Sequence, residues 1–361
     1  MLRTGASIYL APRKGKPFRA AGALTFSFEA VLTVSRRLGR PAGQSAEGKM
    51  KRTFTFPGQG SQFVGMGKSL AEAFQVARDV FAEVDEALGA NLSRLMFEGP
   101  EDDLRLTENA QPALMAVSLA VMRVLENGGV TLAGTAEFAA GHSLGEYSAL
   151  TAAGSLQLAD TAKLLRLRGQ AMQRAVPVGE GAMAALLGLD FEAVSAVAAE
   201  AAQGEVCTPA NDNAPGQVVV SGHRAAVERA IELAKARGAR RGLLLPVSAP
   251  FHCSLMEPAA QEMRQALAAA NLKAPSVPII ANIKAASVTD PDEIAKLLVK
   301  QVTGTVRWRE SVEFMAAEGV QLLLELGAGK VLSGLARRIN PTLETINLQE
   351  PDDIEAFVST L

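Results

Sequence analysis

A serine in this chain lies in a setting that favours nucleophilic chemistry. Residues 141–145 read GHSLG, with Ser143 at the centre, and match the G-x-S-x-G pattern. Apolar residues precede the pattern and a helical pattern follows it, so we expect a sharp strand-to-helix turn that exposes the hydroxyl. Backbone N–H groups at the start of such a helix favour a developing oxyanion. The pattern predicts Ser143 as a nucleophile, with an ordinary glycine-rich turn as the alternative.

A serine nucleophile needs a base, and the chain has three histidines. His142 precedes the serine, so we expect its side chain to point elsewhere, and His223 follows a predicted strand in a surface turn. His252 is the best base by elimination, with a capping or hinge role as the alternative. Cys253 is a weaker candidate nucleophile, because nothing near it lowers the pKa of its thiol, and we expect a buried, inert group.

An arginine lies on the apolar stripe of a predicted helix over 159–176. Arg168 shares this stripe, at helical spacing, with four apolar residues: Leu164, Leu165, Met172 and Val176. A buried guanidinium is costly unless an anion meets it, and its planar fork suits a carboxylate. The pattern therefore predicts that Arg168 binds an anionic substrate. An ion pair with an internal Asp or Glu is the alternative.

Two glycine-rich loops follow predicted strands, at 56–62 and 327–330, but both lack the lysine spacing of a phosphate-binding loop. The first is suited to present a backbone N–H to a site, and the second indicates a strand–helix turn. The cysteines and histidines have no zinc spacing. We therefore expect neither a metal nor a bound cofactor.

The elements that must position these residues alternate between strands and helices from Thr53 onward, which predicts an α/β fold. One long helix is predicted over 69–88 and another over 113–126. Within 178–248 the predicted order becomes β-α-β-β-α-β, the ferredoxin-like arrangement. We predict a catalytic domain made of 51–177 and 249–361, with a ferredoxin-like subdomain inserted at 178–248.

Length and composition exclude several classes of protein. The 361 residues are 48% hydrophobic and 20% charged, which is typical of a globular chain. No apolar run is long enough for a transmembrane helix, and two cysteines are too few for a disulfide framework and fit a reducing compartment. A net charge of −2 argues against a strongly basic nucleic-acid binder. We expect neither a nucleic acid nor a membrane as partner.

The overall charge conceals a division of the chain. Residues 1–50 hold nine basic and two acidic side chains, a net charge of +7, whereas the other 311 residues hold 27 basic and 36 acidic side chains, a net charge of −9. Met50 stands directly before the regular pattern, so the basic leader is either dispensable upstream sequence or a targeting segment. We expect this leader to be disordered or absent from the mature enzyme.

Several stretches together resemble the malonyl-CoA:acyl carrier protein transacylase family of fatty-acid synthesis. They are colinear and span about 53–339 of this chain. The matching stretches are FPGQGSQFVGMG (56–67), ENAQPALMAVSLA (108–120), GHSLGEYSAL (141–150), RGQAMQ (168–173), GAMAALLGL (181–189), NAPGQVVVSG (213–222), PVSAPFHCSLMEPA (246–259), VRWRESVEFM (306–315) and LELGAGKVLSGL (324–335).

The resemblance implies an α/β-hydrolase-like large domain with a ferredoxin-like insertion, and it implies roles for matching positions. Ser143 would be the nucleophile and His252 its base, oriented by the backbone carbonyl of Gln301. Three further groups would bind substrate oxygens: the N–H groups of Gln59 and Leu144 as an oxyanion hole, and the Arg168 guanidinium on the malonyl carboxylate. Phe251 departs from the family, where a small residue or serine is common, so its bulk could reshape the acyl pocket.

The resemblance also implies substrates and partners. Malonyl-CoA would donate its acyl group by a ping-pong reaction to the phosphopantetheine thiol of acyl carrier protein. A serine thioesterase or hydrolase, and an acyltransferase of polyketide synthesis or malonate decarboxylation, remain the alternatives. We expect a monomer in the cytoplasm, or in mitochondria if the leader is a transit segment. The carrier is expected to be acidic, and the candidate basic docking residues are Arg237, Arg240, Arg241, Arg307 and Arg309.

Overall fold

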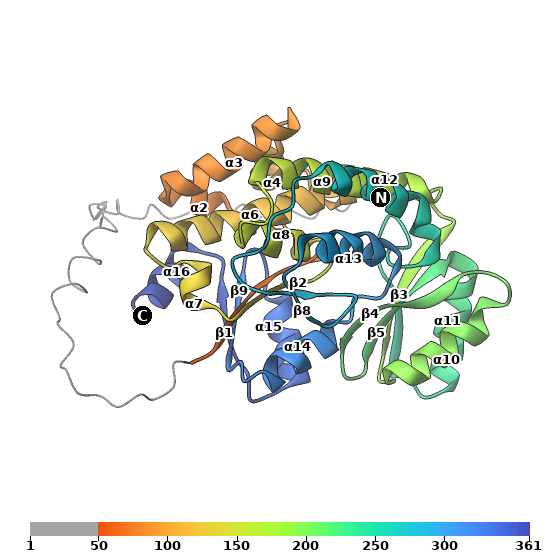
Figure 1. The fold of residues 1–361 in the computed structure, drawn as a ribbon. Coiled ribbons are helices and arrows are strands. Elements are labelled where there is room, and N and C mark those ends of the chain that lie inside the picture. The colour runs from red at the N-terminus through yellow and green to blue at the C-terminus, as the bar shows by residue number, and fades with distance from the viewer. Residues whose placement is uncertain (1–49) are drawn as a thin grey trace, which may run out of the picture. The chain divides into compact units, whose positions relative to one another are not determined.

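The computed structural model describes residues 50–361, so the predicted leader lies outside the described residues. A six-stranded sheet runs through this part of the chain (Figure 1). Its strands are β1 (Arg52–Phe56), β2 (Phe138–Gly141), β7 (Ile279–Ala281), β8 (Ala286–Val288), β9 (Leu322–Leu326) and β10 (Glu344–Leu348). In the order β10-β9-β1-β2-β7-β8, all neighbours pair in parallel except β7 and β8, which are antiparallel.

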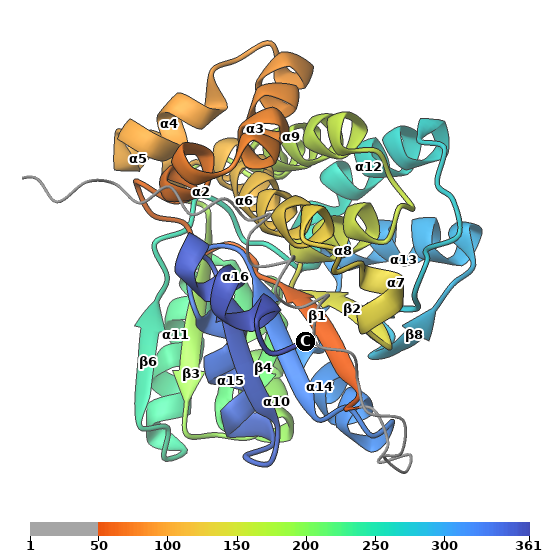
Figure 2. The same cartoon turned by 90° about the vertical axis from the view of Figure 1, so that its left-hand side faces the viewer.

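Helices cover both faces of this sheet (Figure 2). They are α2 (Lys68–Ala73), α3 (Gln75–Leu88), α4 (Leu92–Glu98), α5 (Glu101–Arg105), α6 (Thr107–Asn127), α7 (Leu132–Thr135), α8 (Gly145–Ala152), α9 (Leu158–Ala175), the short 3₁₀ helix η1 (Ser254–Met256), α12 (Glu257–Ala269), α13 (Pro291–Thr303), α14 (Trp308–Ala317), α15 (Val331–Ile339) and α16 (Pro351–Val358). The helices α6 and α8 lie on one face, and α14 and α15 on the other. None of the helices within 50–361 is both long and apolar enough to cross a membrane.

A second, four-stranded sheet lies beside the first. It is built from β3 (Gly181–Leu187), α10 (Phe191–Ala202), β4 (Cys207–Ala214), β5 (Gln217–His223), α11 (Arg224–Ala236) and β6 (Arg241–Leu244). The strand order is β4-β5-β3-β6 and every pair is antiparallel. The α/β class and the βαββαβ order are therefore confirmed, whereas the domain boundaries at 178 and 248 stay a prediction.

Two predicted helices differ from those observed. The single helix over 69–88 is wrong, because Phe74 adopts an extended conformation (φ −124°, ψ 125°) that separates α2 from α3 while its ring packs on the core. The helix predicted over 113–126 begins earlier, at Thr107, and contains Pro112. A proline removes one backbone hydrogen bond, and the almost complete burial of α6 compensates for that loss.

The turn between β2 and α8 depends on a close approach of two backbones. A Cβ atom at Gly145 would lie 2.2 Å from the carbonyl oxygen of Phe56, and one at Gly141 would lie 1.9 Å from the backbone of Gly145. Backbone atoms of a buried parallel strand have little room to move away. The glycines of the GHSLG pentapeptide are thus required by packing, and they allow α8 to begin directly against β1.

We expect Gly145→Ala to destabilise the chain by about 3 kcal/mol, because the added methyl group overlaps a backbone oxygen. Gly334→Ala is the matched control: it lies in α15 with open space around its Cβ, so it should stabilise the helix by about 1 kcal/mol. Urea unfolding followed by circular dichroism measures both changes. Equal stability of Gly145→Ala and the parent would show that the close approach does not constrain this turn.

Candidate active site

Ser143 occupies the sharp turn that the sequence predicts. The strand β2 ends at Gly141, α8 begins at Gly145, and Ser143 between them has φ 55°, in the left-handed region that costs a non-glycine residue about 1 kcal/mol or more. Side chains hold both backbone polar groups of this strained residue. Its N–H donates to Asn282 Oδ1 at 2.7 Å, and Gln301 Nε2 donates to its carbonyl oxygen at 3.0 Å.

His252 contacts the Ser143 hydroxyl directly. Its Nε2 lies 2.9 Å from Ser143 Oγ, and its Nδ1 lies 2.8 Å from the carbonyl oxygen of Gln301. A carbonyl can only accept a hydrogen bond, so Nδ1 carries the proton. The lone pair of the neutral ring then lies on Nε2 and faces the hydroxyl proton. The predicted Ser143, His252 and Gln301 carbonyl are therefore brought together in one hydrogen-bonded chain.

Burial keeps the imidazole of His252 neutral. Desolvation lowers its pKa from the ordinary value of 6.5 to about 3, and the positive charge of Arg168 adds to this shift. The hydrogen bond to the Gln301 carbonyl opposes it only in part. Over the whole neutral range the ring can thus accept the Ser143 proton.

Arg168 is buried beside the same hydroxyl. The side chain is 1% exposed and its guanidinium donates hydrogen bonds to Gln111 Oε1 at 2.6 Å, Gln301 Oε1 at 2.9 Å and Ser143 Oγ at 3.1 Å. Its Nε has no partner among the described residues, and the Tyr147 ring centroid lies 5.6 Å from Cζ.

Every hydrogen-bond partner of this guanidinium is neutral. Among residues 50–361, no carboxylate lies within 4.0 Å of it, so the alternative of a direct ion pair with an internal acid is not what the structure contains. A buried cation without an anionic partner carries a large desolvation cost. The arrangement suits a site completed by an anionic ligand.

These groups open into a cavity of about 410 Å³, a size that suits a small acyl group. Gln59, Leu144 and Phe251 line it together with Ser143, Arg168 and His252. The backbone N–H groups of Gln59 and Leu144 donate no hydrogen bond within the described part of the chain. Two N–H groups without a partner in the described chain, beside a serine hydroxyl, have the chemistry needed to bind an oxyanion.

The remaining sequence candidates lie outside this hydrogen-bonded chain. His142 Nε2 lies 2.9 Å from Asn213 Oδ1. His223 lies at the start of α11, and its Nδ1 accepts a hydrogen bond from the backbone N–H of Val206. The Cys253 thiol is buried and donates to the Pro250 carbonyl at 3.1 Å, and burial raises its pKa. Within 50–361, no three His, Cys, Asp or Glu side chains gather as a metal site would require.

Three polar residues of the site were not predicted from sequence. Gln111 accepts a hydrogen bond from Arg168, and Asn282 accepts one from the backbone N–H of Ser143. Glu146 accepts hydrogen bonds from the backbone N–H of Asn282 and from the side chain of Gln301. A signal existed for two of them: Gln111 is a polar residue within an apolar helix, and Asn282 follows a parallel strand at its carboxyl end, where ligand sites form. Glu146 lies within the matching stretch 141–150 without a role of its own.

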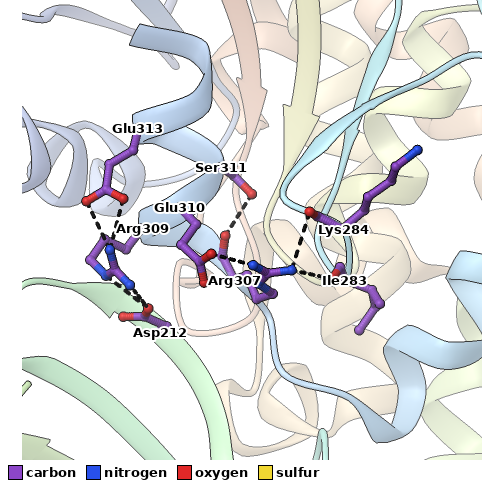
Figure 3. Close-up of polar contacts among 8 residues, drawn as sticks. All are labelled: Asp212, Ile283, Lys284, Arg307, Arg309, Glu310, Ser311 and Glu313. Atoms are coloured by element: carbon purple, nitrogen blue, oxygen red, sulfur yellow. Dashed lines mark hydrogen bonds and ion pairs between the residues drawn. The ribbon is translucent and has the colours of Figure 1, made fainter. Parts of the chain in front are cut away.

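The predicted basic docking patch is largely neutralised (Figure 3). Arg309 bridges Asp212 on β4 at 2.8 Å and Glu313 at 2.9 Å. Arg307 pairs with Glu310 and donates to two backbone carbonyls, those of Ile283 and Lys284. Arg237 pairs with Glu200. Acids offset the charge of these three arginines, whereas the exposed Arg240 and Arg241 at β6 have no ion pair among the described residues.

The fold and the site together define an α/β protein with a paired serine and histidine at a strand-to-helix turn and a buried arginine beside them. Residues 53–340 match the family described as "Acyl transferase domain", and the chain belongs to this family. It is therefore an acyltransferase by family, and the class predicted from its sequence is confirmed.

Relatives and solved structures agree in length and fold. The chain is 47% identical over 312 residues to the malonyl CoA-acyl carrier protein transacylase of Bacillus subtilis, covering 86% of this chain and 97% of that one. A crystal structure of an acyl-carrier-protein-S-malonyltransferase from Bartonella henselae has 56% identity and a TM-score of 0.85, covering 86% and 99%. A malonyl-transacylase solved in complex with a type II PKS acyl-carrier protein has 42% identity and a TM-score of 0.84, covering 86% and 100%.

We expect His252 to stay neutral between pH 5.5 and 8, because burial lowers its pKa well below the ordinary 6.5. Nitrogen NMR of the 15N-histidine-labelled protein measures this directly, since three ring systems are few enough to assign. The His252→Gln variant identifies the signals. Nitrogen shifts of the Nδ1–H tautomer across the range support the geometry, whereas a titration midpoint near 6.5 would contradict it.

Proposed function

We propose that this chain transfers the malonyl group of malonyl-CoA to the phosphopantetheine thiol of acyl carrier protein, through an ester on Ser143, and so supplies fatty-acid biosynthesis. One observation carries the proposal: Ser143 Oγ lies 2.9 Å from a neutral His252 Nε2 and 3.1 Å from a buried Arg168 that has no carboxylate partner in the described chain. The relatives are malonyl transacylases, which agrees with the proposal.

In the first half-reaction, His252 Nε2 takes the hydroxyl proton as Ser143 Oγ attacks the thioester carbonyl carbon. The oxyanion forms beside the N–H groups of Gln59 and Leu144, and each donor in such a site contributes on the order of 3 kcal/mol. The intermediate collapses, the carbon–sulfur bond breaks, and coenzyme A leaves with the proton from His252. A malonyl ester of Ser143 remains.

In the second half-reaction, the carrier thiol gives its proton to His252 and its sulfur attacks the ester carbonyl. The carbon–oxygen bond breaks and the proton returns to Ser143 Oγ, so the enzyme is regenerated. Water could use the same site, and the enzyme must therefore hold the ester until the thiol arrives. The limited cavity and its apolar wall of Met172, Met183 and Phe251 favour the exclusion of water.

Arg168 selects the acyl group. A malonyl carboxylate would meet the guanidinium in the bidentate geometry that Arg favours, whereas an acetyl group would leave a buried cation without an anion. A missing partner for a buried polar group discriminates more strongly than a missing methylene group.

The proposal extends to the acceptor protein and to the cellular compartment. Arg240 and Arg241 are the exposed cations we assign to docking of an acidic carrier protein. A relative solved with a type II PKS carrier makes a polyketide carrier the alternative acceptor. We propose a monomer that acts in the cytoplasm, where two free, buried cysteines stay reduced.

Incubation with malonyl-CoA should add one malonyl group to the peptide that contains Ser143, as measured by mass spectrometry after rapid acid quenching. Ser143→Ala should show no adduct. Addition of carrier protein should discharge the adduct to the carrier thiol. An adduct on Cys253 would remove Ser143 from the role, and equal discharge by water and by carrier would favour the thioesterase alternative.

Arg168→Ala should lower kcat/KM for malonyl transfer by about 10²- to 10³-fold and leave acetyl transfer unchanged or raised, because only malonyl loses a charged partner. Arg166→Ala is the control: this arginine lies on the same helix α9, bonds to Asn109 and does not line the cavity. Steady-state kinetics with both acyl-CoAs measure the split. An equal fall for the two acyl groups would contradict the assignment of Arg168 to the carboxylate.

A further inference from the structure

A buried carboxylate lies behind the cavity and takes no part in the steps above. Glu146, in the first turn of α8, is 1% exposed and does not line the cavity. Its Oε2 accepts the backbone N–H of Asn282 at 3.0 Å and the Nε2 of Gln301 at 2.8 Å. Both donors are neutral, and no cation among residues 50–361 pairs directly with this acid.

One amide side chain joins Glu146 to Arg168. Gln301 donates through Nε2 to Glu146, and its Oε1 accepts from Arg168 Nη2 at 2.9 Å. A carboxylate accepts and a guanidinium donates, so these two neighbours fix the orientation of the amide. Glu146 and Arg168 thus form a buried pair of opposite charges separated by one neutral side chain.

The protonation of Glu146 depends on the charge of Arg168. Burial raises the pKa of Glu146 to about 7, and the positive guanidinium opposes that rise. A ligand carboxylate on Arg168 would cancel this opposition and raise the pKa of Glu146 further. A proton would then bind to Glu146 as the ligand binds.

Few other ionisable groups act on Glu146. Tyr147 is its neighbour on α8, and burial raises the pKa of that phenol to about 12, so it stays neutral. The elements α6, α9, β1, β2 and β7 also pack against α8, and within residues 50–361 Arg168 on α9 is the only one of their charged side chains that shifts the pKa of Glu146. On the Arg168 side lie His252 and His142, and burial lowers the pKa of both.

We propose that Glu146 is a positioning residue for acidic acyl groups: it holds Gln301 against Arg168 in the free enzyme, and it becomes more fully protonated from solvent when a malonyl carboxylate binds to Arg168. The inference rests on the proposed function of Arg168. It makes the binding of acidic acyl groups proton-linked, whereas the binding of neutral acyl groups is not. Malonyl affinity therefore falls as pH rises through the pKa of the free enzyme.

Isothermal titration calorimetry of Ser143→Ala, which cannot be acylated, tests the proposal with malonyl-CoA and acetyl-CoA. Titrations at pH 7.5 in two buffers of different ionisation enthalpy give the number of protons taken up. We expect malonyl-CoA to take up roughly half a proton more than acetyl-CoA. Its affinity relative to acetyl-CoA should fall about tenfold from pH 6.5 to 8.5. The phosphates of coenzyme A are common to both ligands and cancel.

Two further variants in the Ser143→Ala background identify the proton acceptor. Glu146→Gln keeps an oxygen acceptor for Gln301 and Asn282 but cannot titrate, so the difference in proton uptake should vanish. Glu325→Gln is the matched control. Glu325 is also 1% exposed and accepts two backbone N–H groups, those of Leu332 and Ser333, away from the cavity, so the difference should persist.

Two results would overturn the inference: equal proton uptake for the two ligands, or a difference that survives Glu146→Gln. The comparison of ligands needs no change at Glu146, so it decides the question even if that variant does not fold. A failure of the proposed function would give a different calorimetric result. If Arg168 does not bind the malonyl group, Ser143→Ala will bind malonyl-CoA and acetyl-CoA with equal affinity at every pH.

Discussion

The site depends on one buried positive charge. Arg168 is almost fully enclosed, and its hydrogen bonds go to Gln111, Gln301 and Ser143, none of which is an anion. Such a group is stable only if the surrounding dipoles orient toward it and an opposite charge lies near. Glu146 supplies that charge through Gln301 without occupying the cavity. The position in front of Arg168 is thereby left open to the cavity, where we propose that a ligand carboxylate binds.

Gln301 is the residue through which these requirements meet. Its backbone carbonyl accepts a hydrogen bond from His252, and its side-chain Oε1 accepts one from Arg168. Its Nε2 donates to the carbonyl oxygen of Ser143 and to the carboxylate of Glu146. Both Ser143 and His252 have positive φ, at 55° and 60°. Strained backbones persist where surrounding contacts over-determine them. One glutamine on α13 thus helps to maintain His252, Ser143 and Arg168, the proposed base, nucleophile and anion-binding group, in a single geometry.

The local part of this site could be predicted from sequence. The GHSLG turn is predicted by its glycines, which the close approach of two backbones requires. The burial of Arg168 is predicted by its place on the apolar stripe of a helix. The βαββαβ order also follows from short-range patterns. The partners of the turn could not be predicted in this way. Asn282 lies 139 residues from Ser143, and Gln301 lies 133 residues from Arg168, so only the folded sheet brings them together.

The helix break at Phe74 and the ion pair of Arg309 with Asp212 were missed for the same reason. Each is decided by tertiary packing or by an acid on another element, such as Asp212 on β4. Spacing along the chain contains no signal for either, whereas the pairs of Arg307 with Glu310 and of Arg309 with Glu313 lie three and four residues apart on one helix. Charge counted in the sequence therefore includes arginines whose charge is offset by neighbouring acids in the folded chain.

We propose that the buried guanidinium of Arg168 makes this acyltransferase selective for a malonyl group. The ratio of kcat/KM for malonyl-CoA over acetyl-CoA, measured with the unmodified enzyme and carrier protein, tests it most directly. We predict a ratio of about 10³ or more, because acetyl leaves a buried cation without its anion. A ratio within tenfold of unity would contradict the account.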